Sequence, residues 1–262
     1  MKKLIALLCA LALALSLAAC SGSDTDQTST DGSQNSSTTP TAVASSGSAD
    51  TGMKEKLDQL QYAAYQDVFY NDNAEDYADK EYSTDGVFGI IYDAFNSVTR
   101  YYVWGYADTT KCCDWQWELK FPDGYTVPES GSYVDVSGIM TASADALDGY
   151  WLTDVDMTVE EEFAHAGYDY DMTTISPTLA RVQIINMQNY TDIFGGKTLR
   201  VFGRAMGTNT VQHPYYDNAW SMDFTSLDGI TVATGSDMVL TGTFEASGEG
   251  SVVNTESITI VD

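Results

Sequence analysis

The sequence is poor in basic residues, histidine and cysteine, and these shortages exclude several classes of function. It contains 12 lysines and arginines against 38 aspartates and glutamates, which gives a formal net charge of −26. A polyanion of this strength is repelled by phosphate backbones and by anionic lipid head groups. We therefore expect no nucleic-acid partner and interpret the charge as favouring solubility.

The two histidines, His165 and His213, stand in no recognised arrangement with serine or cysteine. The sequence also lacks a glycine-rich phosphate loop, an HExxH zinc motif and the twelve-residue spacing of an EF-hand. Carboxylates are so abundant that their pairing carries no information. These absences predict a protein that is not an enzyme.

The first twenty residues have the pattern of a secretion signal. Lys2 and Lys3 precede an apolar run over residues 4–17 that is short for a transmembrane helix. The run ends in Leu-Ala-Ala-Cys, which resembles the bacterial lipobox and implies cleavage before Cys20 and a diacylglycerol on its thiol. We expect a signal peptide at residues 1–19 and a protein anchored extracytoplasmically to the lipid of a bacterial membrane. The alternative is an ordinary signal peptide.

Residues 20–52 are rich in serine, threonine, aspartate and glycine and offer almost nothing to bury. A chain of this composition cannot offset its ordering entropy, so it predicts a flexible tether.

The remainder of the chain repeats itself, which predicts a duplicated domain. Val87-Phe88-Gly89 matches Val201-Phe202-Gly203 in sequence. Further along, the two copies keep the same order of residues, and the matched pairs are Trp115 with Trp220, Asp123-Gly124 with Asp228-Gly229, and Gly138 with Gly242.

Each copy is rich in aromatic and β-branched residues separated by turn signals, which is typical of strands. Five strands with a long link between the third and fourth favour an all-β fold of two tandem OB-like small barrels, preceded by a short helix. A generic β-sandwich is the alternative. We predict a helix plus first domain at residues 53–165 and a second domain at 175–262. The second strand of the second copy should be short or missing.

Two segments lead into the copies. Residues 53–71 are helical in pattern, because Leu57, Leu60, Ala64 and Val68 recur at three- and four-residue spacing. Residues 179–187 alternate Val182 and Ile184, which favours a strand.

The segments "YTDIFGGKTLRVFG", "DTTKCCDWQWE" and "YVDVSGIM" resemble uncharacterised lipoproteins of Gram-positive bacteria. Those proteins carry OB-like domains with a Tyr-x-Gly-Lys-Thr start and a Cys-Cys centre. More distantly, the chain is similar to the Cys-Cys domain of proteins that accompany putative zinc-linked permeases. The resemblance implies fold and location, without an established activity. This chain keeps Gly196-Lys197-Thr198 only in the second copy and Cys112-Cys113 only in the first.

Cys112 and Cys113 begin a stretch of alternating residues. Cys113, Trp115, Trp117, Leu119 and Phe121 share one face, and the intervening polar residues share the other. Cys113 is therefore predicted as a small core residue. Two alternatives require a turn or bulge at residue 112: a vicinal disulfide, and a zinc or copper ion bound by one or both thiols with help from Asp108, Asp114 or His213.

The predicted function is a non-catalytic module that binds a small ligand or metal ion at the Cys112-Cys113 end of the first domain. Trp104, Trp115 and Trp117 are candidate ligand contacts, because OB barrels stack ligands on exposed aromatic rings. The favoured interpretation, however, is that these rings fill the barrel interiors. A structural or adaptor lipoprotein that contacts an envelope protein, such as a permease, is the competing function.

Overall fold

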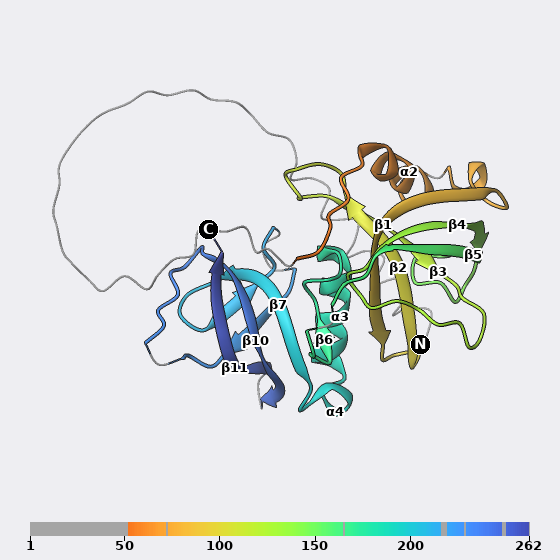
Figure 1. Cartoon of the computed structure of the whole chain (residues 1–262). Helices are drawn as coiled ribbons and strands as arrows, with labels where there is room; N and C mark the ends of the chain where they lie inside the picture. The colour runs from red at the N-terminus through yellow and green to blue at the C-terminus, as the bar shows by residue number, and fades with distance from the viewer. Residues whose placement is uncertain are drawn as a thin grey trace, which may run out of the picture. The chain divides into compact units, whose positions relative to one another are not determined.

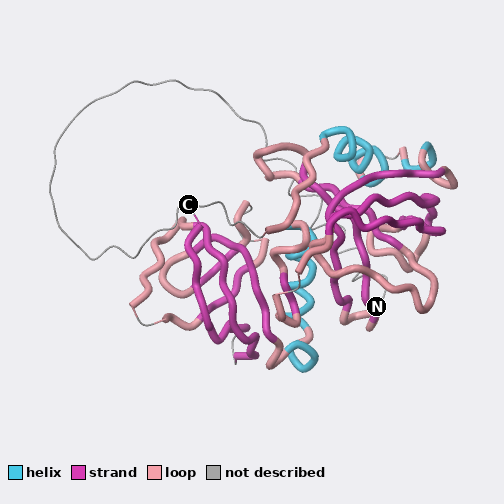
Figure 2. The backbone as a smooth tube through the Cα atoms, viewed as in Figure 1, coloured by secondary structure: helices cyan, strands magenta, loops and turns pink. Residues whose placement is uncertain are grey.

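The structure is a computed structural model that describes residues 52–71, 73–164, 166–215, 219–227, 229–247 and 250–261. The predicted signal peptide, Cys20, almost all of the predicted tether and His165 lie outside these residues. Strands predominate over helices in the described part (Figures 1 and 2). None of its helices is long and apolar enough to span a membrane.

The helical elements of the described residues, in chain order, are α2 (Gln59–Phe69), the 3-10 helix η2 (Ala74–Asp76), α3 (Pro177–Asn189) and α4 (Thr191–Phe194). The strands are β1 (Glu81–Asp93), β2 (Val98–Tyr106), β3 (Asp114–Leu119), β4 (Tyr133–Ala142), β5 (Tyr150–Glu161), β6 (Tyr170–Asp171), β7 (Thr198–Ala205), β8 (Thr210–Gln212), β9 (Ser221–Phe224), β10 (Asp237–Ser247) and β11 (Gly250–Val261). The fold is therefore all-β with few helices, as predicted.

Strands β1 to β5 form a closed barrel in the order β1-β2-β3-β5-β4 (Figure 1). β1 pairs antiparallel with both β2 and β4, which closes the ring. The pairing of β3 with β5 is parallel and joins Leu119 to Leu152. Five strands closed in this Greek-key manner make an OB-like barrel.

Strands β7 to β11 repeat this arrangement. β7 pairs antiparallel with β8 and β10, β8 pairs with β9, and β10 pairs with β11. The parallel pairing is again between the third and fifth strands of the copy, at Phe224 and Val253. β6 adds a short parallel pairing to β7. The second strand of this copy, β8, is only 3 residues long, as predicted.

Two glycines occupy equivalent positions in the two barrels. Gly138 in β4 and Gly242 in β10 each lie where the register with the next strand shifts, which marks a β-bulge. A Cβ atom would lie 2.8 Å from the carbonyl oxygen of Thr153 at Gly138 and 2.3 Å from that of Asn254 at Gly242. The close backbone approach therefore requires glycine at both positions.

The predicted match of Gly89 with Gly203 is wrong by three residues. Gly203 packs against the ring of Trp220, where an added Cβ would lie 3.0 Å from the ring, and Gly86 packs in the same way against Trp115, where an added Cβ would lie 3.1 Å away. Both would also place a Cβ 2.7 Å from a carbonyl oxygen of the neighbouring strand. A Cβ at Gly89 would instead meet the side chains of Ile175 and Trp104. Gly86, not Gly89, is therefore the equivalent of Gly203 in the first barrel.

Helix α2 is shorter than predicted and buries a different face. The carboxylate of Asp58 accepts the first-turn N–H groups, so the helix begins at Gln59 and leaves Leu57 outside it. Leu60 is 83% exposed. The buried residues of α2 are Tyr65 and Val68, which pack into the core of the first barrel. The prediction that Leu57 and Leu60 belong to a buried apolar stripe is therefore wrong.

Residues 179–187 were predicted as a strand but form most of helix α3. The Oγ of Ser176 accepts the N–H of Leu179, and Pro177 occupies the first turn, where its fixed φ favours a helix. The buried residues recur at helical spacing and are Leu179, Ala180, Gln183, Ile184 and Met187. The alternation of Val182 and Ile184 was too short to distinguish the two structures.

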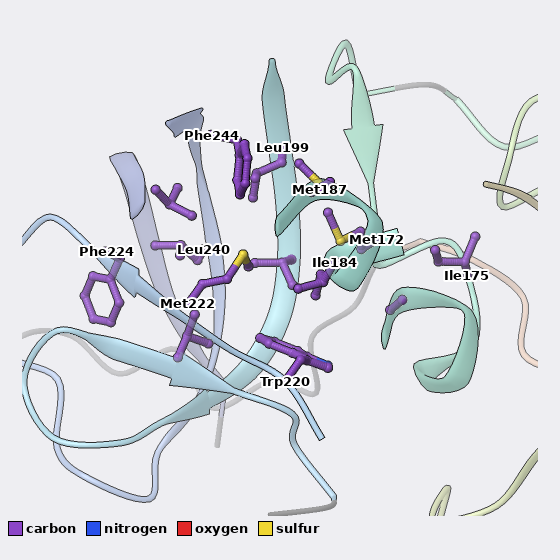
Figure 3. Close-up of a cluster of buried hydrophobic side chains, with 14 of the residues drawn as sticks. Met172, Ile175, Ile184, Met187, Leu199, Trp220, Met222, Phe224, Leu240 and Phe244 are labelled. Carbon is purple, nitrogen blue, oxygen red and sulfur yellow. The ribbon is translucent and has the colours of Figure 1, made fainter. Parts of the chain in front are cut away.

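Helix α3 shares a core with the second barrel (Figure 3). The labelled side chains of this core are Met172, Ile175, Ile184, Met187, Leu199, Trp220, Met222, Phe224, Leu240 and Phe244. Ile91, Ala94 and Tyr102 of the first barrel belong to the same cluster. The cluster around α3 therefore includes residues of both barrels, whereas the interior of the first barrel forms a separate cluster.

We predict that Gly138→Ala and Gly242→Ala each lower the free energy of unfolding by about 1–3 kcal/mol, because the backbone must shift away from a carbonyl oxygen. Gly242→Ala should cost more, since its approach is closer. Ser137→Ala, beside Gly138 in the same strand, is the control and should change stability by less than about 0.5 kcal/mol. Urea unfolding followed by tryptophan fluorescence measures all three. Wild-type midpoints for both glycine variants would contradict the proposed constraint.

Candidate functional site

Both cysteines lie in the connection between β2 and β3, residues 107–113, which we call the thiol turn. Lys111 has a φ of 55°, a left-handed conformation that reverses the chain, and β3 begins only at Asp114. The sulfur atoms of Cys112 and Cys113 lie 3.3 Å apart. Both residues are partly exposed. The turn thus places the two thiols side by side.

The prediction that Cys113 is a core residue is wrong. The strand begins at Asp114, after the turn, and Cys113 is only partly buried, although its carbonyl oxygen still accepts the N–H of Ala107. From that point the prediction holds, because Trp115, Trp117 and Leu119 are buried in the first barrel.

Asp108 lies within the thiol turn. Its Oδ1 accepts hydrogen bonds from the Oγ1 and the backbone N–H of Thr110, at 2.6 and 2.8 Å. These bonds lower the pKa of Asp108. The Oγ1 of Thr110 also lies 3.3 Å from the sulfur of Cys112. Thr110 therefore links Asp108 to the thiol pair.

Asp114 points to helix α3 instead. Its Oδ2 accepts the backbone N–H of Thr178 at 2.9 Å, and its Oδ1 accepts the Oγ1–H of the same residue at 2.7 Å. Burial raises the pKa of Asp114, and the bonds from Thr178 oppose that shift. The carboxylate caps the first turn of α3.

His213 is buried beside the core of the second barrel, with 2% of its surface exposed. Its Nδ1 accepts the backbone N–H of Tyr215 at 3.1 Å, and its ring meets Trp220 edge to face. Burial lowers the pKa of His213 to about 4, and the charge of Arg181 adds to the effect. The imidazole is therefore neutral at physiological pH.

The predicted metal ligands are not assembled into one site. No group of three or more histidine, cysteine, aspartate or glutamate side chains within the described ranges is placed to hold a metal ion. Cys112, Cys113 and Asp108 share the thiol turn, whereas Asp114 caps α3 and His213 packs against Trp220.

The three tryptophans proposed as ligand contacts are buried. Trp104, Trp115 and Trp117 have 1%, 0% and 1% of their surface exposed. Trp115 and Trp117 fill the first barrel, and the Nε1 of Trp104 donates to the carbonyl oxygen of Thr174. These rings are therefore buried, as the favoured interpretation predicted, and they offer no exposed face to a ligand, so the alternative that they contact one is wrong.

A cavity of about 160 Å³ adjoins the thiol turn. Lys111 of the turn lines it and forms an ion pair with Glu55, which also lines it. His213 and Trp220 contribute from the second barrel.

A larger cavity, of about 280 Å³, lies between β1, the β6 region and α3, and we call it the Gln183 cavity. Residues 90–92 of β1 line one side, and residues 169–172 line another. Two further polar residues of the lining could interact with a ligand: Gln183 of α3 and the exposed Glu129.

Gln183 is the one buried amide in the wall of this cavity among the described residues, and it is 1% exposed. Its Oε1 accepts the backbone N–H of Tyr92 at 2.8 Å, which fixes the orientation of the amide. The Nε2 group is buried and has no hydrogen-bond partner among the described residues. An unsatisfied buried donor costs about 1–3 kcal/mol, so a ligand acceptor at this point would be stabilising.

The wall of the Gln183 cavity is acidic. The carboxylate of Asp169 accepts hydrogen bonds from the backbone N–H of Thr198 and from the Nζ of Lys197, and these partners lower its pKa. Asp171 accepts the backbone N–H of Thr173 and pairs with Arg200. The Lys-Thr dipeptide that supported the sequence resemblance thus orients a carboxylate of this cavity.

Sequence reasoning missed Gln183, because residues 179–187 were interpreted as a strand. One signal was present: at helical spacing, Gln183 is the polar residue within the apolar stripe of Leu179, Ile184 and Met187. A polar residue on a buried helical face requires a partner.

We predict that the free energy of unfolding falls as pH decreases from about 6.5 to about 4, with a contribution from His213 of roughly 3 kcal/mol. The unfolded chain binds a proton on this histidine over that range, whereas the folded protein, with its pKa of about 4, does not. The stabilisation is complete above pH 6.5. Urea unfolding of wild type and His213→Asn at several pH values measures the difference in slope, from which carboxylates common to both proteins cancel. Parallel slopes would contradict the prediction.

No family model, no curated protein and no solved structure matches this chain. The fold class and the two cavities are therefore assigned from its own residues and geometry.

Proposed function

We propose that this chain is a lipid-anchored, extracytoplasmic binding protein without catalytic activity, and that its ligand occupies the Gln183 cavity. The observation that carries the proposal is the buried amide of Gln183, a residue that lines the cavity and whose Nε2 has no hydrogen-bond partner among the described residues. Lipid on Cys20 would hold the protein at the membrane. The basic end, apolar run and terminal cysteine of residues 1–20 support that anchor.

The ligand is expected to present a carbonyl oxygen to Gln183. The N–H of Tyr92 already binds the Oε1 of this residue, and the Nε2 group is the one that lacks a partner among the described residues, so the ligand is expected to supply an acceptor. A carbonyl accepts without donating and would satisfy this group at the usual distance of about 2.9 Å.

The ligand is expected to be neutral or cationic. Asp169 and Asp171 keep lone pairs beyond those used by their partners, so they can accept N–H or O–H groups from a bound molecule. An anion would be repelled by both and by Glu129.

The volume and the apolar lining of the cavity further restrict the class of ligand. A cavity of 150 Å³ accommodates benzene, so about 280 Å³ accommodates roughly eleven non-hydrogen atoms. Ile90, Tyr92, Tyr170 and Met172 give apolar and aromatic surface for a ring. A small planar amide combines these properties.

Nicotinamide is therefore the chosen probe, and nicotinate is its anionic counterpart of matching shape. We expect nicotinamide to bind and nicotinate to bind at least tenfold more weakly, as measured by ligand-observed NMR on the full-length protein in detergent. Gln183→Met removes the donor at similar volume and should raise the Kd for nicotinamide about tenfold, the equivalent of one hydrogen bond.

Gln188→Met is the matched control. It lies on the same helix and also loses an amide hydrogen bond, to the carbonyl oxygen of Ser221, but outside the cavity lining. Its Kd should equal that of wild type, and circular dichroism confirms that both variants fold. Equal binding of the two probes, equal effects of the two variants, or no binding at all would refute the proposal and favour the adaptor function.

A further inference from the structure

The thiol turn holds two sulfur atoms next to each other, away from the Gln183 cavity. Successive side chains of a strand point to opposite faces, so two adjacent cysteines in β3 would be separated. The left-handed Lys111 and the late start of β3 instead bring Cys112 and Cys113 to a sulfur–sulfur distance of 3.3 Å. Both residues are partly exposed.

This spacing is poorly suited to the predicted zinc ion. Two Zn–S bonds of about 2.3 Å at a tetrahedral angle separate the sulfurs by about 3.8 Å. Structural zinc also takes four ligands, and the described residues offer no group of three. A disulfide needs only that the sulfurs close to about 2.05 Å, which a surface turn can allow.

We propose that Cys112 and Cys113 form a reversible vicinal disulfide by exchange with a low-molecular-weight disulfide. One thiolate attacks a sulfur of the reagent, forms a mixed disulfide and releases one thiol. The second cysteine then loses its proton and attacks the protein sulfur of that mixed disulfide, releasing the second thiol. The two cysteines are oxidised by two electrons in all, and the reagent is reduced to two thiols.

The bond should be easy to reduce. Neighbouring Cα atoms are held about 3.8 Å apart by a trans peptide, below the range of about 4.4–6.8 Å usual for disulfides. Strained disulfides have more oxidising potentials than structural ones and are the labile class. The turn therefore suits reversible oxidation rather than permanent crosslinking.

Oxidation of the two cysteines should also affect the smaller cavity, because a residue of the thiol turn lines it. Lys111 immediately precedes Cys112, lines that cavity and is paired with Glu55. Closing the two sulfurs constrains the turn that carries this lysine. The inference is independent of ligand binding in the Gln183 cavity.

The test uses the full-length protein, reduced and then equilibrated with glutathione at defined ratios of oxidised to reduced form. After thiol alkylation, trypsin cleaves at Lys111 and Lys120 and isolates both cysteines in one peptide, apart from Cys20. We expect this peptide to become unalkylated and lighter by two hydrogen atoms under oxidising ratios, and to revert fully with excess reduced glutathione. Each single variant, Cys112→Ser and Cys113→Ser, should instead hold one stable glutathione adduct.

Two results would overturn the inference. One is a wild-type peptide that keeps two alkylated thiols, or carries two glutathione adducts, at the most oxidising ratio. The other is stoichiometric zinc or copper in protein purified without chelator, bound so that both thiols resist oxidation and lost in the serine variants.

Discussion

The first turn of helix α3 is the contact on which the arrangement of the described residues depends. The Oγ of Ser176 accepts the N–H of Leu179 and donates to the Oε1 of Gln116 in β3. Asp114, from the same strand, accepts two bonds from Thr178. Because β3 belongs to the first barrel and α3 packs into the core of the second, these polar bonds fix one barrel against the other. Buried polar networks of this kind are costly to break, since each lost bond leaves an unsatisfied group.

The same contact determines where both candidate sites lie. Asp114 directly follows Cys113, so its attachment to α3 anchors the end of the thiol turn. Gln183 lies about two helical turns further along α3, where it meets Tyr92 of β1. A shift of α3 relative to β3 would therefore disturb the thiol pair and open the cavity wall together. The sites are chemically separate but share one mechanical support.

The alternation of residues in β1 to β5 was enough to predict an all-β fold with two small barrels, because a two-residue period of apolar side chains indicates a strand. The same pattern does not indicate which other elements pack against the outer face of a strand. Gln116 and Glu118 were assigned to the outward face of β3, yet they are 4% and 7% exposed. Gln116 is covered by the start of α3, and Glu118 pairs with the buried Arg100. The positions of the thiols and of Gln183 depend on the same tertiary contacts, which the local pattern does not contain.

The two cavities lie outside the barrel interiors. A five-stranded barrel is narrow, and large buried side chains such as Trp117 occupy its interior. Space for a ligand is therefore left where the barrels meet α3 and the connections between strands. Gly105 pairs with Trp115 in the first copy, and His213 occupies the corresponding place beside Trp220 in the second. The connection that follows this position in the first barrel is the thiol turn, whose Lys111 lines the smaller cavity, and His213 of the second barrel lines the same cavity. Both barrels thus contribute side chains to one cavity.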